Sequence, residues 1–261
     1  MDIIQELLKD VPLPRLIKIR QAFPAEEIED VPATLTAALQ QSGQLERILP
    51  GMRIAIAVGS RGVAEIPALV RTTVQELKKK NAVPFIIPAM GSHGGATAEG
   101  QAEVLAHLGI TEESAGCPIV SSMEVVEVSR LDNGLPVYVD KYALQSDGIV
   151  LINRIKPHTA FRGPNESGLA KMIAIGLGKQ KGAETCHAYS FKHMAAHIPA
   201  MACQALANAP ILFGIGTVEN AYDRVAKIVI APAASLIEID RQLLVEAKAS
   251  MPRICFSPID V

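Results

Sequence analysis

The sequence predicts an α/β protein in which βα repeats build a mostly parallel sheet with helices on both faces, in a Rossmann-like arrangement. Short runs of branched aliphatic residues alternate with longer segments of helical periodicity. Tryptophan is absent and aromatics make up only 4% of residues, so aliphatics must fill the core; this suits helices packed on parallel strands better than a β-sandwich. We expect the 261 residues to form a single domain of this kind.

The first elements follow from local pattern. Leu16 to Arg20 is a strand candidate, and apolar residues recur at helical spacing from Ala33 to Leu49, after Pro32. The β-branched run from Arg53 to Val58 predicts a buried strand. The segment from Ala64 to Lys80 predicts a helix, and three lysines in its last turn match the helix dipole.

A second β-loop-α repeat and a hairpin come next. Val83 to Pro88 predicts a strand, and a helix is expected from about Ala98 to Leu108 after the glycine-rich loop 91–97. Ile119 to Ser129 and Leu135 to Val139 are expected to pair, because Asn133-Gly134 supplies the positive φ angles of a tight turn.

The second half continues the alternation. Gly148 to Asn153 predicts a buried strand, and residues 169–175 are apolar and helical apart from Lys171. A long helix is expected over 190–208 and a last helix within 232–250. Two further strands are expected, at 211–218 and 226–230, and the chain ends at Ser257–Val261 in what resembles the start of another strand.

Composition narrows the function classes. A net charge of -2 and a pI near 6.3 give no reason to expect nucleic acid or a membrane surface as partner, so a small molecule is the expected one. The four cysteines show no CxxC pair, which argues against a disulfide framework or a zinc knuckle. The N-terminus lacks an apolar run suited to a signal sequence or membrane span, and a cytoplasmic location is expected.

Polar residues gather in loops that follow the predicted strands, where open α/β sheets bind ligands. His93 lies in Gly91-Ser92-His93-Gly94-Gly95, His158 follows Lys156-Pro157, and Lys171 precedes His187 by sixteen residues. Each histidine can exchange a proton or bind a metal near neutral pH. A lysine on an otherwise apolar helix must snorkel, pair with an acid or be modified.

Two further segments could hold an anion. Ser60 and Arg61 follow a buried strand, and the turn from Gly176 to Gly182, with Gly178 and Lys179, could hold a phosphate through backbone N–H groups and an ammonium. A solvated turn is the alternative for that second segment. Neither segment matches GxGxxG or a P-loop, and Ser92 is not on a nucleophile elbow.

Four segments together resemble the N-terminal domain of the nickel-dependent lactate racemase family: 59–62 (GSRG), 88–97 (PAMGSHGGAT), 156–163 (KPHTAFRG) and 167–172 (SGLAKM). The resemblance extends over most of the chain. It implies a nickel pincer nucleotide, a pyridinium mononucleotide with two thiocarbonyl arms that is tethered through a lysine and completed by a histidine. The family's C-terminal domain is expected to be absent or truncated here.

Carried over by position, Lys171 resembles the tethering lysine, His187 the nickel ligand, and His93 and His158 the acid/base pair. Arg61 resembles an arginine that anchors cofactor and substrate. The resemblance implies racemisation of a 2-hydroxy acid by hydride transfer. The Pro164-Asn165-Glu166 segment, longer than in the lactate enzymes, predicts a different substrate pocket and leaves the identity of the 2-hydroxy acid open. The alternatives are a nucleotide-dependent oxidoreductase and a non-catalytic cofactor-binding domain.

Overall fold

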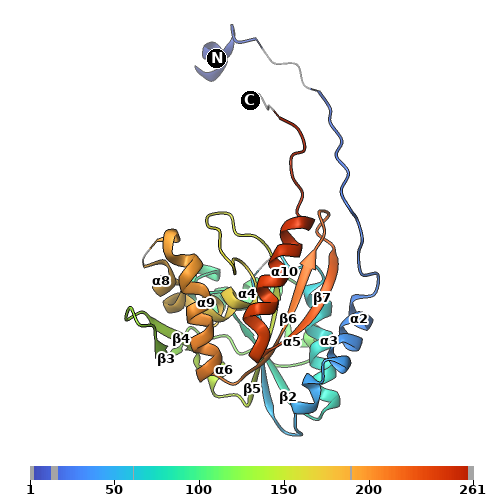
Figure 1. Ribbon diagram of the computed structural model, residues 1–261, viewed down its shortest axis with the longest axis vertical. Coiled ribbons are helices and arrows are strands. Elements are labelled where there is room, and N and C mark those ends of the chain that lie inside the picture. The colour runs from blue at the N-terminus through green and yellow to red at the C-terminus, as the bar shows by residue number, and fades with distance from the viewer. Residues whose placement is uncertain (1–2, 13–16, 61, 189, 258–261) are drawn as a thin grey trace.

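The computed structural model describes residues 3–12, 17–60, 62–188 and 190–257. Its centre is a five-stranded sheet in the order β2-β1-β5-β6-β7 (Figure 1). The strands are β1 (Arg53–Val58), β2 (Val83–Pro88), β5 (Gly148–Arg154), β6 (Ile211–Glu219) and β7 (Val225–Pro232). The first four in this order run parallel and β7 pairs antiparallel with β6, so the predicted α/β class with a mostly parallel sheet is confirmed.

Helices cover both faces of the sheet because its strands are apolar on both sides. In β1, Ile54, Ile56 and Val58 face one hydrophobic cluster while Ala55 and Ala57 face the other. The first cluster is closed by α2 (Val31–Gln41), α3 (Ile66–Lys79), α4 (Ala98–His107) and the short α5 (Glu112–Ala115).

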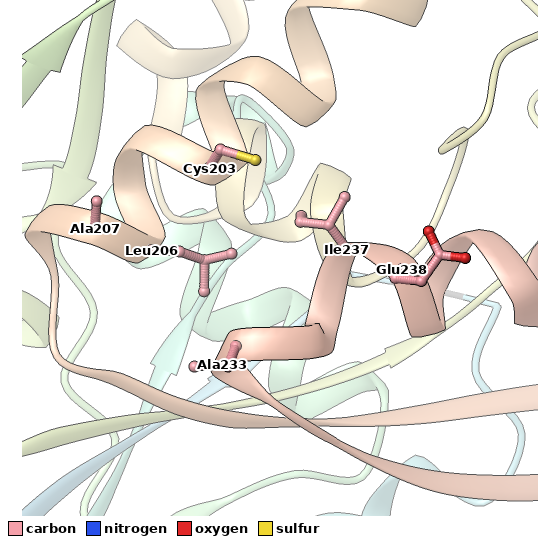
Figure 2. A pocket seen from close by; sticks show the side chains of 7 residues that line it. Cys203, Leu206, Ala207, Ala233, Ile237 and Glu238 are labelled. Atoms are coloured by element: carbon pink, nitrogen blue, oxygen red, sulfur yellow. The ribbon is translucent and has the colours of Figure 1, made fainter.

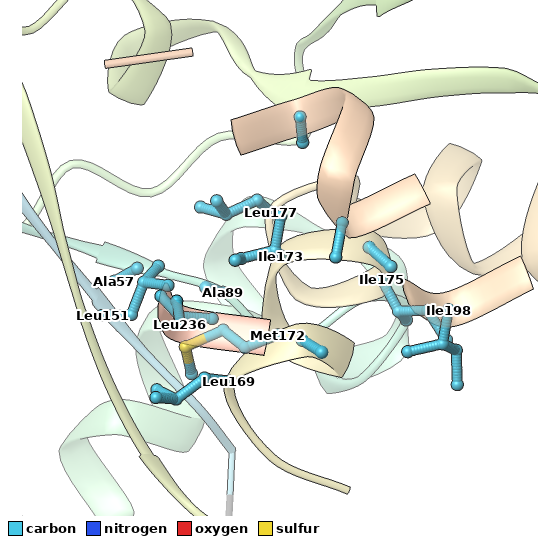
Figure 3. Close-up of a cluster of buried hydrophobic side chains, with 14 of the residues drawn as sticks. Ala57, Ala89, Leu151, Leu169, Met172, Ile173, Ile175, Leu177, Ile198 and Leu236 are labelled. Atoms are coloured by element: carbon cyan, nitrogen blue, oxygen red, sulfur yellow. The ribbon is translucent and has the colours of Figure 1, made fainter. Parts of the chain in front are cut away.

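The second cluster lies under α9 (Phe191–Asn208) and α10 (Leu236–Ser250). Its centre is the segment formed by α7 (Leu169–Lys171) and a π-helix, Met172–Gly176, whose apolar side chains pack toward Leu151, Ile198 and Leu236 (Figure 3). Helix α8 (Lys179–His187) follows directly and adds Ala183 and Cys186 to this cluster. The apolar run of the sequence is therefore helical, as expected, and buried.

The predicted hairpin forms outside the main sheet, from β3 (Val125–Arg130) and β4 (Pro136–Asp140). Its turn contains Gly134 at φ +82°, but Asn133 has no positive φ, and the backbone N–H of Leu131 donates to the carbonyl of Leu135 at 2.9 Å. The hairpin is therefore closed by a three-residue loop and not by the tight Asn-Gly turn that was expected. The first strand begins later than expected because Ile119 instead makes an isolated parallel bridge with Ile86 of β2. Helix α6 (Lys141–Leu144) follows β4.

Three other expectations differ from the structure. Residues 17–20 form no strand, and Leu16 lies outside the described residues. The helix expected to reach Leu49 ends at Gln41, because Gly43 turns left-handed (φ +69°) before a 3₁₀ turn at Gln44–Arg47. Residues 251–257 are not a strand, and 258–261 are not described. Short elements complete the fold: α1 (Ile3–Leu8) and the 3₁₀ turns Gly94–Ala96 and Ala233–Ser235.

Candidate functional site

A pocket of about 690 Å³ opens at the carboxyl ends of β1, β2 and β5. The chain enters the sheet at β1, adds β2 on one side and later β5 on the other, so the strand order reverses at β1. Open α/β sheets bind ligands at such a reversal, because the loops that leave neighbouring strands diverge there. The lining includes six residues predicted from the sequence: Ser60, His93, His158, Lys171, Gly176 and His187.

Ser60 and His93 meet although 33 residues separate them in sequence. Ser60 follows β1 and His93 follows β2, and Ser60 Oγ lies 2.5 Å from His93 Nδ1. The His93 loop folds back tightly on α4. Gly94 of this loop has φ +64°, and a Cβ on Gly94 would lie 2.6 Å from the backbone of Gly100 in α4. The glycine motif therefore permits a close backbone approach that brings the imidazole to the pocket.

The loop that carries His158 is closed at its base and held from inside. Lys156 and Ser167 form an antiparallel bridge, with hydrogen bonds of 2.7 and 3.2 Å, so the intervening residues project as one loop beyond β5. The buried carboxylate of Glu166 accepts hydrogen bonds from the backbone N–H groups of His158 (2.8 Å) and Gly163 (3.2 Å). Lys248 of α10 pairs with the same carboxylate at 2.7 Å. The Pro164–Glu166 segment thus shapes the His158 loop.

The His158 ring is held as a neutral imidazole. Its Nδ1 accepts a hydrogen bond from the backbone N–H of Ala160 at 3.1 Å, which places the ring proton of the neutral form on Nε2. Burial against Phe161, with ring centroids 4.5 Å apart, and then the positive charge of Lys171 lower the pKa of His158 to about 4. This differs from the expectation that both histidines titrate near neutrality.

Lys171 is the half-buried last residue of α7, directly before the π-helix. The buried Asp240 and the half-buried Asn153 fix this segment. Asp240 of α10 accepts a 2.6 Å hydrogen bond from the backbone N–H of Leu169, and Asn153 donates to the carbonyl of Gly168 at 2.8 Å. A π-helical turn offsets the backbone within a helix and occurs often at functional sites. Lys171, the only cation of residues 169–176, lines the pocket.

His187 ends α8 and contributes from the far side of the pocket. Its Nδ1 lies 2.6 Å from the carbonyl oxygen of Ala183, and because a carbonyl only accepts, Nδ1 carries the proton. Nε2 is thereby left as a lone-pair donor, the arrangement typical of metal-binding histidines. The neighbouring Cys186 is fully buried and does not line the pocket, and burial raises the pKa of its thiol to about 11.

The predicted phosphate turn does not form. Residues 179–187 are helical, and the Lys179 side chain is fully buried away from the pocket, paired with Asp140 at 3.2 Å. Gly178 is needed for packing, since a Cβ there would lie 2.7 Å from Gly182. Gly176 does line the pocket, and a Cβ on it would meet the Ala89 carbonyl oxygen at 2.6 Å. Arg61 lies outside the described residues.

The structure adds residues that the sequence did not single out. Arg154 and Lys156 line the pocket, and Arg154 forms an ion pair with the buried Glu219 at 2.5 Å. Glu219 also accepts the backbone N–H of Ala64, so this pair fixes the loop after β1. Polar residues inside apolar segments, such as Asn153 and Asp240, were the available signal, but their partners are remote in sequence.

A second hollow, of about 470 Å³, lies between α9 and α10 (Figure 2). Its lining is mostly apolar, with the Cys203 thiol on one wall and the Glu238 carboxylate on the other. The predicted site residues that the structure describes lie elsewhere. Among described residues, no cluster of three or more His, Cys, Asp and Glu side chains could hold a metal ion, and no helix is long and apolar enough to cross a membrane.

Two comparisons with known proteins, one of sequence and one of structure, point to the same family. The family model of the lactate racemase N-terminal domain matches residues 5–198. The fold is similar to that of the lactate racemase apoprotein from Thermoanaerobacterium thermosaccharolyticum, with a TM-score of 0.62 and 14% identity over 85% of this chain. The chain covers 57% of the length of that structure. The search of curated proteins found no match to the chain. The chain therefore belongs to the family of lactate racemase N-terminal domains.

Proposed function

We propose that the chain is the cofactor-binding part of a racemase or epimerase that acts on a 2-hydroxy acid and uses a nickel pincer nucleotide. The observation that carries the proposal is the convergence of His93, His158, Lys171 and His187 on one pocket. The volume of about 690 Å³ lies in the range of small-molecule and cofactor sites. Membership of the lactate racemase family supports the reaction class.

The chemistry of the lining fits such a group. Lys171 offers an amine for a covalent tether, and His187 Nε2 offers one lone pair for nickel, which suits a metal whose other ligands come from the cofactor. Lys156 adds positive charge to the lining and favours a phosphate or carboxylate, whereas the charge of Arg154 is balanced by Glu219. When bound, the pincer group would supply an acceptor for the hydrogen and electron pair that leave the substrate's Cα.

His93 and His158 then transfer the hydroxyl proton of the substrate. When the Cα–H bond breaks with its electron pair, the hydroxyl must release a proton, and the substrate becomes a 2-keto acid. Neutral His93, hydrogen-bonded to Ser60, can take that proton because the serine hydroxyl adapts to either ring tautomer. His158 presents an Nε2–H donor while Ala160 occupies its Nδ1. The two histidines are therefore inequivalent in the free protein, although either enantiomer requires one base and one acid.

The first experiment tests the cofactor. The chain is co-expressed with a cofactor-producing pathway and nickel, and the mass of the peptide containing Lys171 is measured together with bound nickel. We expect a nucleotide-sized adduct on Lys171, absent in Lys171→Ala, and loss of nickel in His187→Ala. The matched control is His107→Gln, an exposed histidine of α4 outside the pocket. An unmodified Lys171, under conditions that load a known lactate racemase, contradicts the proposal.

The second experiment tests turnover on the loaded protein. Each enantiomer of a panel of 2-hydroxy acids is incubated with it, and products are separated by chiral chromatography. His93→Gln and His158→Gln should retain the adduct and nickel but lose racemisation. Because the chain covers 57% of the lactate racemase apoprotein, loading without racemisation would assign it the binding role alone.

A further inference from the structure

We propose that Gln101 is a positioning residue for His93, and that the buried Lys179–Asp140 ion pair fixes the orientation of its amide. This inference rests on the proposed function for one point, which is the role of His93 in proton transfer. The contacts of Gln101 themselves are independent of that function.

One amide group holds both ends of the short turn that contains His93. Gln101, on α4, is fully buried, and its Nε2 donates to the carbonyl oxygens of Gly91 (2.8 Å) and His93 (3.2 Å). Both N–H bonds of the amide are thereby used on the loop. The backbone at His93 is fixed by a side chain from another element, and its imidazole reaches Ser60 from that fixed point.

The other side of the same amide faces a buried ammonium. Gln101 Oε1 accepts a hydrogen bond from Lys179 Nζ at 3.3 Å. An ammonium has only donors, so it must face the amide oxygen and not the amide nitrogen. Lys179 therefore excludes the flipped amide, in which an oxygen would face the two loop carbonyls.

Lys179 also ties this amide to the strands on either side. Its ammonium forms an ion pair with Asp140 at 3.2 Å and donates to the carbonyl of Pro88, the last residue of β2. Asp140 accepts in addition the backbone N–H of Ala143 at 2.9 Å. The end of β2, the His93 turn, α4 and the end of β4 thus meet at one buried charge.

This buried ion pair has an energetic cost that its orientation of the amide accounts for. Lys179 has φ +53°, a left-handed conformation that is unfavourable for a lysine. Burial lowers the pKa of its ammonium, although Asp140 opposes that effect. An apolar pair would fill the space without desolvating two charges. It would not orient the amide.

The test is the NMR signal of the His93 ring, assigned by its loss in His93→Gln. Gln101→Met removes all amide hydrogen bonds at similar volume. Gln101→Glu keeps an acceptor for Lys179 but loses both donors to the loop. In both variants we expect the His93 ring resonances to move, together with the pH midpoint of their titration.

The resonances of His107, which lies on α4 like Gln101, should stay in place and report that the protein is folded. Gln180→Met, an exposed glutamine of α8, is the matched control.

Unchanged His93 resonances in both variants would overturn the proposal. This readout needs no activity, so its result stands even if the protein fails to racemise any 2-hydroxy acid. If racemisation is found, kcat should fall roughly 10- to 100-fold in Gln101→Glu while cofactor loading is retained, since a small displacement of a catalytic group has effects of that order. An unchanged kcat in a racemising protein would also contradict the inference.

Discussion

Asp240 accepts a hydrogen bond of 2.6 Å from the backbone N–H of Leu169, 71 residues away, and so caps the short helix that ends at Lys171. Its other carboxylate oxygen accepts from Asn165 at 2.9 Å. A Cβ at Gly168 would lie 2.1 Å from this carboxylate, so only glycine allows the approach. The last helix of the fold thus anchors the segment that carries the tethering candidate.

Asp240→Ala should lower the free energy of unfolding by about 2–3 kcal/mol, because it leaves a helix N-terminus and a buried amide without their acceptor. The measurement is the urea midpoint at neutral pH. Glu238→Ala, an exposed carboxylate on the same helix, should change stability by less than about 0.5 kcal/mol. Equal midpoints for the two variants would argue against the capping role.

His158 should stay uncharged in mildly acidic solution, because its pKa is lowered to about 4 by burial first and by Lys171 second. Lys171→Met removes the nearby positive charge, so the pKa of His158 should rise, while burial keeps it below its ordinary value. NMR titration of the His158 ring measures both. Lys181→Met, which removes an exposed cation over the Tyr138 ring, serves as the control and should leave the titration in place.

Glu166 should make stability depend on pH. Burial on its own raises the pKa of this carboxyl, but the hydrogen bonds from Lys248 and from the N–H groups of His158 and Gly163 outweigh it and leave the pKa below its ordinary value. Its stabilising contribution is therefore fully present above the unfolded pKa, roughly 4.3, and is lost as the pH falls through the folded pKa.

Glu166→Gln should accordingly be less stable than the wild type by about 1–3 kcal/mol at pH 7, with the difference shrinking below about pH 4. Denaturant titrations at both pH values test this. Glu124→Gln breaks only an exposed ion pair with Lys141 and should show a small difference at either pH. A difference for Glu166→Gln that is constant with pH would show that the carboxylate charge is not what stabilises the loop.

The cysteines should divide into two classes of reactivity. Cys117 and Cys186 are buried, and burial raises the pKa of each thiol to about 11, whereas Cys203 and Cys255 are exposed. A thiol-specific chromogenic reagent should therefore titrate two thiols in the native protein and four after unfolding. Rapid reaction of a third thiol in the native state would contradict the buried placement of Cys117 or Cys186.

Sequence patterns were sufficient where the physical cause is local. The apolar runs at 53–58 and 83–88 gave the bounds of β1 and β2, because strands buried on both faces leave a continuous apolar signature. The polar loops that follow β1, β2 and β5 held Ser60, His93 and His158, since parallel strands end at the same edge of the sheet. Lys171 stood out because every neighbour in its segment is apolar.

Lys179 shows where local pattern fails. In sequence it lies in a glycine-rich basic turn typical of a phosphate site, but in the fold it is fully buried beside Asp140 and Gln101. Its partners lie 39 and 78 residues away, and a lysine carries the same local signature whether its partner is a phosphate or a buried carboxylate. The sequence by itself determined the α/β class and which loops carry chemistry, because periodicity and turn residues act over a few positions. Only the tertiary structure decided which polar groups reach the pocket and which position them, because that depends on contacts between elements remote in the chain.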